Sequence, residues 1–217
     1  MSPVLPFDIT ALIIDIVGEN EDTFLLKELA LVSHSFHQIC SKHLFATVDL
    51  HDVGWGYHPS SKRGLVELVK SRPNVVNYIR KLKYKVSYDI NDSDDDHLLS
   101  PILSNFLPTT SRLNFLAIDA SDLDWNTLAS SLTSAFLHLM HLPTINHIKL
   151  SFIQNFPLSS LTLSVNLLRL DMLYLCRLNP LDEDPSEIVS LLEMMPKIRE
   201  FIPYFPFRRA DHKDVTC

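Results

Sequence analysis

Histidine and cysteine, side chains that commonly bind zinc, recur at every third position between residues 34 and 43. A helix turns by about 100° per residue, so His34 and His43 face opposite sides of any helix that contains both. His37 and Cys40 lie between them, and the four side chains cannot converge on one ion. The spacing therefore predicts partly exposed helix positions and no metal site.

A run of acidic and polar side chains at residues 91–96, NDSDDD, supplies oxygen atoms of the kind that Ca²⁺ prefers. It lacks the glycine and the later bidentate glutamate of an EF-hand loop, so the sequence predicts a solvated loop rather than a cation site. His138 and His141 lie one helical turn apart, without a third ligand nearby in the sequence. We expect these two histidines to be satisfied in the core or at an interface.

Nucleophilic catalysis and phosphate binding both lack their usual sequence patterns. No serine lies in a GxSxG elbow, and no glycine occurs beyond Gly64, which excludes the usual phosphate-binding loops there. Cys40, Cys176 and Cys217 lack a recognisable catalytic setting. We predict no catalytic residue and no cofactor, and we interpret the chain as not an enzyme. The alternative is a hydrolase or transferase whose acids and histidines meet only in the folded chain.

Charge argues against nucleic acid as a partner. The 217 residues contain 26 acidic and 19 basic side chains, a net charge of −7, which opposes attraction to polyphosphates. Residues 22–44 could be read as a helix-turn-helix that enters the DNA major groove. However, residues 1–50 contain two lysines and seven acidic residues, and phosphates would repel that surface.

Hydropathy and the N-terminal residues argue against a membrane or secreted protein. The longest apolar runs, residues 11–17 and 136–142, are broken by charged or histidine side chains and fall well short of the roughly 20 residues that span a bilayer. The first eight residues, MSPVLPFD, lack the basic start and cleavage site of a secretion signal. Three scattered cysteines are too few for a disulfide framework. We predict an intracellular protein, cytoplasmic or nuclear.

Apolar periodicity predicts three short helices in the first fifty residues, near 8–17, 22–32 and 33–44, followed by an extended segment at 46–50. We expect Gly18 and Asn20 to stop the first helix, and Ser33 to cap the third. A unit this small has too little interior to bury all of its Ile, Leu, Val and Phe side chains. Part of that apolar surface is therefore expected to face a partner.

The strings LPFDITALIIDIV and LLKELALVSHSFHQICSKHLFATVDL resemble the F-box, especially the versions found in fungal proteins. Phe36 stands where many family members have tryptophan. The resemblance implies binding to the small adaptor subunit of cullin-RING ubiquitin ligases. It assigns the adaptor contacts to Leu5, Pro6, Ile9, Ile13, Ile16, Leu29, Val32 and Phe36.

Beyond the F-box-like module at 1–50, residues 51–64 read as a linker because they contain three of the four glycines. Residues 65–217 then alternate helix-like and strand-like stretches. The expected helices are 65–71, 97–106, 127–142 and 186–195. The expected strands are 78–88, 113–118, 145–153, 167–175 and 198–204.

The segments LPTINHIKL, VNLLRLDMLYL and MPKIREFIPYF look like degenerate leucine-rich repeats, whose short strands line one face of a solenoid. We therefore predict an α/β fold: a three-helix F-box followed by an irregular repeat solenoid with short parallel strands. An ordinary α/β domain with a parallel sheet is the alternative. Four aromatic residues between 201 and 207 suggest an exposed apolar edge, or a fragment of a longer receptor.

The resulting functional prediction is a substrate receptor of an SCF-type cullin-RING ubiquitin ligase. The F-box would bind the adaptor and, through it, the cullin complex, while the repeats would bind a target protein of unknown identity. A protein-interaction scaffold outside any ligase is the alternative.

Overall fold

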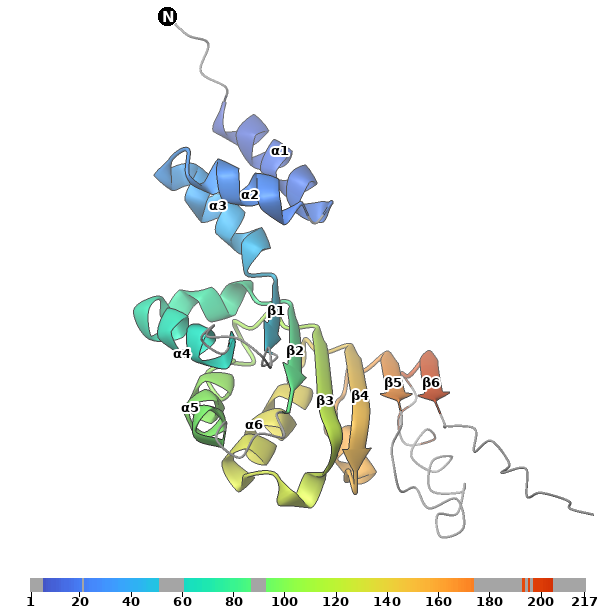
Figure 1. Ribbon diagram of the computed structural model, residues 1–217. Helices are drawn as coiled ribbons and strands as arrows, with labels where there is room; N and C mark the ends of the chain where they lie inside the picture. Colours follow the sequence, from blue (N-terminus) through green and yellow to red (C-terminus); the bar gives the residue numbers. More distant parts are fainter. Residues whose placement is uncertain are drawn as a thin grey trace, which may run out of the picture.

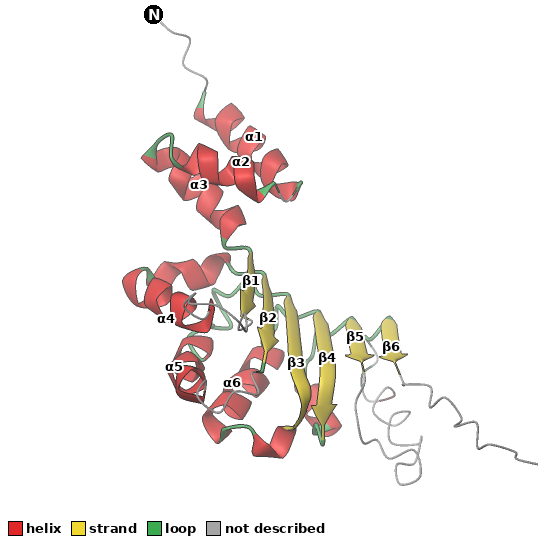
Figure 2. Cartoon of the chain, in the orientation of Figure 1, coloured by secondary structure: helices red, strands yellow, loops and turns green. Residues whose placement is uncertain are grey.

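The computed structural model describes residues 6–20, 22–50, 61–86, 93–173, 193, 195 and 197–204. Within them the chain is mixed α/β, with a six-stranded parallel sheet and several helices (Figure 1). Figure 2 shows the three N-terminal helices at one end of the described chain, next to the sheet and the helices packed against it. No helix in the described part of the chain is long and apolar enough to cross a bilayer.

The N-terminal helices are α1 (Phe7–Glu19), α2 (Thr23–Ala30) and α3 (His34–Leu44). Local sequence starts two of them: the Asp22 carboxylate accepts a hydrogen bond from the Leu25 amide, and the Ser33 hydroxyl accepts one from the Phe36 amide. A small core holds the three helices together. Its buried residues are Ile14, Leu26, Ile39 and Cys40. We call α1, α2 and α3 the helical module.

Helix α1 ends at Glu19 with Asn20 as its C-cap, as expected, but Gly18 lies inside the helix and does not end it. The imidazole ring of His43, on α3, lies directly against the space that a Cβ atom at residue 18 would occupy. His43 Nε2 donates a hydrogen bond of 2.7 Å to the Asp15 carboxylate, one turn earlier on α1. Glycine is therefore needed here because it lets α3 approach α1 closely enough for this bond.

We expect Gly18→Ala to destabilise the chain, although alanine is the better helix former by about 1 kcal/mol. The added Cβ displaces the His43 ring and breaks its bond to Asp15. Gly64→Ala is the matched control, because Gly64 also lies in a helix but has no atom near its Cβ position. That control should gain roughly 0.5–1 kcal/mol. Urea unfolding measures both, and a stabilising Gly18→Ala would contradict the close contact.

The six strands follow one another across the sheet in chain order, and every neighbouring pair is parallel. They are β1 (Thr47–Leu50), β2 (Lys81–Lys85), β3 (Phe115–Asp124), β4 (His147–Gln154), β5 (Arg169–Leu173) and β6 (Glu200–Tyr204). The connections contain α4 (Ser61–Ser71), α5 (Ser93–Leu103), α6 (Ser130–Met140), and the 3₁₀ helices η1 (Pro73–Tyr78), η3 (Trp125–Thr127) and η4 (Leu158–Leu163). Figure 1 shows α4, α5 and α6 along one side of the sheet, and none of these three helices covers the opposite face.

Each strand begins in the same backbone geometry. The carbonyl of Ala46, just before β1, accepts hydrogen bonds from the amides of both Arg80 and Lys81, at 2.8 and 2.9 Å. At the start of each later strand, two consecutive backbone amides likewise donate to the carbonyl just before the preceding strand. Residues 47, 81, 115, 147, 169 and 200 are therefore equivalent, at intervals of 34, 34, 32, 22 and 31 residues.

The core follows the same repeat. From β2 to β5, an apolar residue two places before the strand is buried, and so are the second and fourth residues of the strand, because alternate side chains face the helices. At β1 and β6 the residue two places before the strand and the second strand residue are only partly buried. Ile79, Leu82 and Tyr84 fill these places in one layer. Phe136 of α6 packs its ring edge-on against the Tyr84 ring, with 4.9 Å between the ring centroids.

Several predicted boundaries were wrong. Helix α4 begins at Ser61, so the last four residues of the predicted linker are helical, and residues 51–60 lie outside the described part. Helix α5 begins at Ser93, although residues 91–96 were expected to form a loop. Serine favours the start of a helix, and the three aspartates that follow it favour the first turn, where the helix dipole is positive. The predicted helix at 186–195 falls almost wholly outside the described residues.

Candidate functional site

The helical module exposes an unusual amount of apolar side-chain surface. Fifteen large apolar side chains are exposed among the described residues, and nine of them lie between residues 7 and 32. We call these nine residues the apolar helical surface. They are Phe7, Ile9, Leu12, Ile13, Ile16, Phe24, Leu25, Leu31 and Val32. So many exposed apolar side chains on a small module are typical of a protein-docking site.

The residues assigned to adaptor binding divide into two groups. Ile9, Ile13, Ile16 and Val32 belong to the apolar helical surface, and Val32 is 66% exposed. Leu29 and Phe36 are partly buried and pack against the core of the module. Pro6 is the exposed residue just before α1, and Leu5 lies outside the described residues.

The sequence analysis missed other exposed members of this surface, notably Phe24 and Leu31, which are 74% and 82% exposed. They lie at the first turn of α2 and just beyond its end. The only signal in the sequence that could have identified them is their position, because each is an apolar residue outside the face that the short helix α2 buries.

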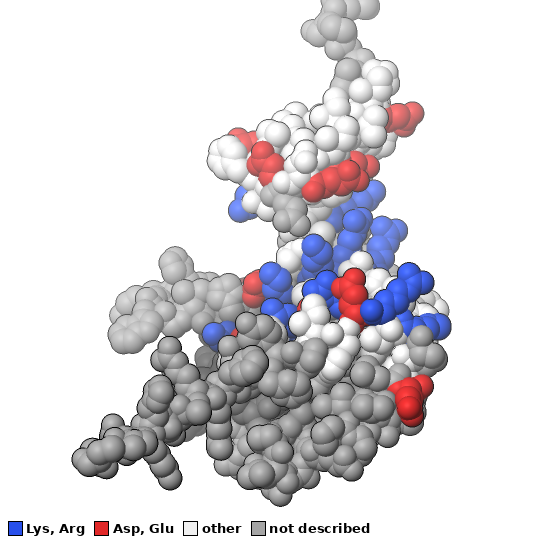
Figure 3. Space-filling view, turned by 90° about the vertical axis from the view of Figure 1, so that its right-hand side faces the viewer, with Lys and Arg blue, Asp and Glu red and all other residues white. Residues whose placement is uncertain are grey.

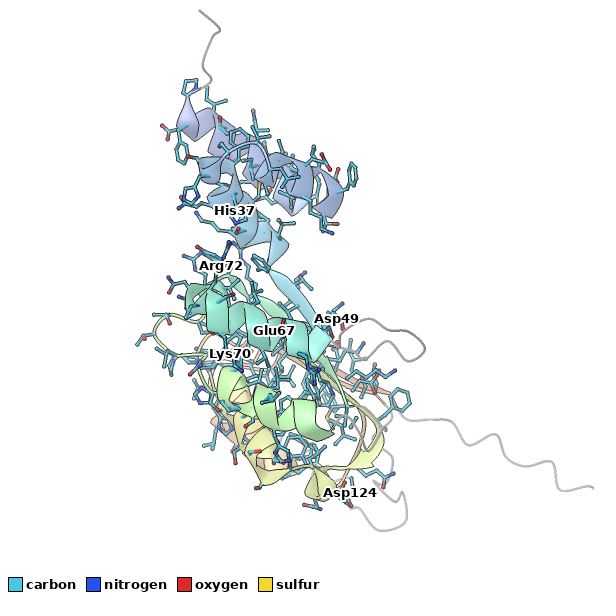
Figure 4. The ribbon with its side chains drawn as sticks, turned by 60° about the vertical axis from the view of Figure 1, so that its left-hand side comes forward. His37, Asp49, Glu67, Lys70, Arg72 and Asp124 are labelled. Carbon is cyan, nitrogen blue, oxygen red and sulfur yellow. The ribbon has the colours of Figure 1, made fainter. Side chains whose placement is uncertain are left out.

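The four histidine and cysteine residues on α3 have different environments. His34 contacts the Gln38 side chain, His43 bonds to Asp15, and His37 Nε2 accepts a hydrogen bond of 3.0 Å from the Arg72 guanidinium (Figure 4). Cys40 is fully buried, contrary to the expectation of partial exposure, and burial raises the pKa of its thiol. No group of three metal-ligating side chains occurs among the described residues.

The other two histidines singled out in the sequence are satisfied separately. His138 Nε2 donates to the Phe106 carbonyl at 2.8 Å, and His141 Nε2 donates to the Ser160 carbonyl at 2.9 Å. The first bond joins α6 to the segment between α5 and β3, and the second joins the residue just after α6 to η4. Both histidines therefore link successive connections between the strands.

The face of the sheet away from α4, α5 and α6 carries the first, third and fifth side chains of the strands. We call it the open sheet face. On β2 it presents Lys81, Lys83 and Lys85, all exposed, and on β4 it presents Lys149. Figure 3 shows lysine and arginine side chains gathered just below the helical module, with a few acidic side chains among them.

Toward β5 and β6 the charges of the open sheet face neutralise one another. Asp171 accepts hydrogen bonds from His147 Nε2 at 2.9 Å and from Arg169 Nε at 3.0 Å, and Arg169 also donates to Glu200 at 2.9 Å. Burial raises the pKa of the Asp171 carboxyl, but the hydrogen bonds and positive charges of Arg169 and His147 outweigh it. The pKa therefore lies below its usual value.

This arrangement predicts a pH-dependent contribution to stability. Because the folded-state pKa of Asp171 is depressed, its contribution is full above the unfolded value of about 3.9 and is lost as the pH falls through the folded value. Asp171→Asn should therefore cost about 1–3 kcal/mol at neutral pH and progressively less in acid. Glu200→Gln, at the exposed end of the network, should cost less than about 0.5 kcal/mol. Urea unfolding between about pH 7 and 3 tests both; a pH-independent Asp171→Asn effect would contradict the prediction.

A groove of about 1030 Å³ separates the helical module from the starts of the first four strands. One wall contains Asp15, Glu19 and Leu26 of the module. The floor follows the strand starts and contains Ala46, Thr47, Arg80, Lys81, Lys83, Asn114, Phe115, Asn146 and His147. The floor is thus predominantly cationic, whereas the wall opposite is acidic.

The apolar helical surface, the open sheet face and the groove are the candidate contact surfaces among the described residues. No protein-family model matches the chain, and no match is found among curated proteins. The functional interpretation therefore depends on the chemistry of these surfaces.

Proposed function

We propose that the chain is a substrate-receptor subunit of an SCF-type cullin-RING ubiquitin ligase. The helical module binds the adaptor subunit, and the region from β1 to β6 binds the target protein. Chemistry belongs to other subunits. The chain raises the effective concentration of a target lysine beside the ubiquitin-charged enzyme.

The observation that carries this proposal is the apolar helical surface. Nine exposed apolar side chains cluster in 26 residues of a module whose own core buries only four. Ile9, Ile13, Ile16 and Val32, which the F-box resemblance assigns to adaptor binding, are among the nine. Exposing so much apolar surface to water is unfavourable by roughly 25 cal/mol per Å², and a partner that covers it recovers that free energy.

The order of the strands supports the second half of the proposal. In a doubly wound α/β sheet the strand order reverses at a switch point, and helices cover both faces. Here all six strands follow chain order. The same pair of backbone hydrogen bonds to one carbonyl occurs at the start of every strand after the first. A one-directional stack of repeats with an open strand face is the arrangement that leucine-rich repeats use to hold proteins.

Reconstitution with purified subunits tests the proposed function. The full chain should coelute with the ligase adaptor, and the pair should then bind the cullin subunit. Failure to bind the adaptor would overturn the proposal. Adaptor binding that excludes the cullin would favour the alternative, a protein-interaction scaffold that works outside a ligase.

A further inference from the structure

The part of the open sheet face nearest the helical module is cationic, in contrast to the acidic chain as a whole. On β1 to β4 and the residues just before them, its charged side chains are five basic and two acidic. These residues are Arg80, Lys81, Lys83, Lys85 and Lys149 against Asp49 and Asp119. The whole chain carries a net charge of −7. The local excess of positive charge is therefore a property of this face.

Five basic side chains outnumber two acidic ones on this part of the face, so pairing among these seven residues leaves a net positive charge. At β5 and β6, Asp171 and Glu200 take up the charge of Arg169 through bonds of 2.9–3.0 Å. At β2, the contact between Lys83 and Asp49 is 3.9 Å long, and both side chains are about half exposed. An exposed pair at that distance contributes little, so Lys83 can exchange it for an acidic ligand.

The dimensions of the groove determine which ligand fits. Neighbouring strands lie about 4.8 Å apart, so the floor from β1 to β4 extends about 14 Å, the length of four or five extended residues. Phe115, which is only partly buried, supplies an apolar contact on this floor. An extended peptide that crosses the strand starts would place alternate side chains against the cationic floor.

The acidic wall distinguishes a peptide from a nucleic acid. Asp15 and Glu19 face the groove from α1 and would repel a ligand with a negative charge at every unit, as in a polyphosphate. A peptide can place its carboxylates against the floor and neutral groups against the wall.

We infer that this groove and the adjoining lysines of β2 and β4 bind an extended acidic segment of the target protein. The inference deepens the proposed function and rests on it, since it names the class of target that the open sheet face holds. Charge complementarity selects the ligand, and the length of the floor limits the contact to a short segment.

Fluorescence anisotropy with the full chain tests this inference. The probe is a labelled peptide of about eight residues with glutamate at alternate positions, because those side chains share one face of an extended chain. Its matched control has glutamine in place of every glutamate. The glutamate peptide should bind, the affinity should fall with added salt, and the glutamine peptide should bind about tenfold more weakly or worse.

The double variant Arg80→Glu, Lys83→Glu should weaken binding of the glutamate peptide by about tenfold or more, because both side chains line the groove. Arg80→Gln, Lys83→Gln should give a smaller loss in the same direction. The control variant Lys27→Glu, Lys70→Glu makes the same change in net charge on α2 and α4, outside the groove (Figure 4 labels Lys70), and should bind normally.

Several outcomes would overturn the inference. They are equal binding of the two peptides, no binding up to about 1 mM peptide, equal weakening by the control variant, or tighter binding of a single-stranded oligonucleotide of similar length. Adaptor binding is measured on the same preparations. If peptide binding fails while adaptor binding persists, only this inference is overturned. If adaptor binding fails while the peptide still binds, the proposed function is overturned instead.

Discussion

Replacing Ile9 and Ile13 together by aspartate is expected to abolish adaptor binding while leaving the chain folded. Both side chains are nearly half exposed and neither belongs to the buried core of the module. Apolar residues at the centre of an interface commonly contribute 2 kcal/mol or more, and each aspartate would also have to be desolvated. Since about 1.4 kcal/mol is tenfold in affinity, the double variant should bind at least about 100-fold more weakly.

Isothermal titration with the purified adaptor measures this loss, and thermal unfolding followed by circular dichroism checks the fold. Aspartate at residue 9, in the first turn of α1, is compatible with the helix dipole, and residue 13 is nearly half exposed, so little loss of stability is expected. The matched control is Leu163→Asp, Val165→Asp, two exposed apolar side chains in and just after η4. Unchanged binding of the Ile9 and Ile13 variant, or an equal loss in the control, would contradict the assignment of the docking surface.

Phe136→Ala is expected to be the most destabilising of the single substitutions considered, at about 3–5 kcal/mol. The Phe136 ring is fully buried on α6, 4.9 Å from the Tyr84 ring of β2 and 6.3 Å from that of Trp125. Its removal leaves a cavity between the helix layer and the sheet. Because domains of this size are stable by only about 5–15 kcal/mol, a substantial part of the stability would be lost.

Phe115→Ala is the matched control for this prediction. Phe115 also contacts another ring edge-on, that of His147 at 4.6 Å, but it is only partly buried on the open sheet face. It should cost less than about 1.5 kcal/mol, because its removal leaves no enclosed cavity. Urea unfolding of both variants tests the difference. Equal losses would show that the core between α6 and the sheet is not where the structure places it.

Much of the secondary structure could be predicted from the sequence, because its signals are local. Asp22 and Ser33 are capping residues that mark the starts of α2 and α3 within the chain itself. Apolar residues at alternate positions mark the strands, and the predicted strand near 145–153 corresponds to β4. Boundaries were less certain, as the early start of α5 shows, because a run of aspartates suits both a loop and the first turn of a helix.

Which apolar residues of the helical module are free to bind a partner was decided only by tertiary structure. Ile13 and Ile14 are adjacent and chemically identical, yet Ile13 is exposed and Ile14 is buried against α2 and α3. Periodicity assigns a face to a helix, but it does not say which of two apolar faces meets the rest of the chain. That choice depends on how α3 packs, and Gly18 makes this packing possible by leaving room for the His43 ring.

The sequence by itself determined that the chain is acidic and that it alternates helices and strands after residue 65. Only the tertiary structure decided that Arg80, Lys81 and Lys83 share a groove with Asp15 and Glu19, and that Asp171 holds both His147 and Arg169. The physical reason is separation along the chain. His147 and Asp171 lie 24 residues apart, and they meet because parallel pairing sets β4 and β5 in register.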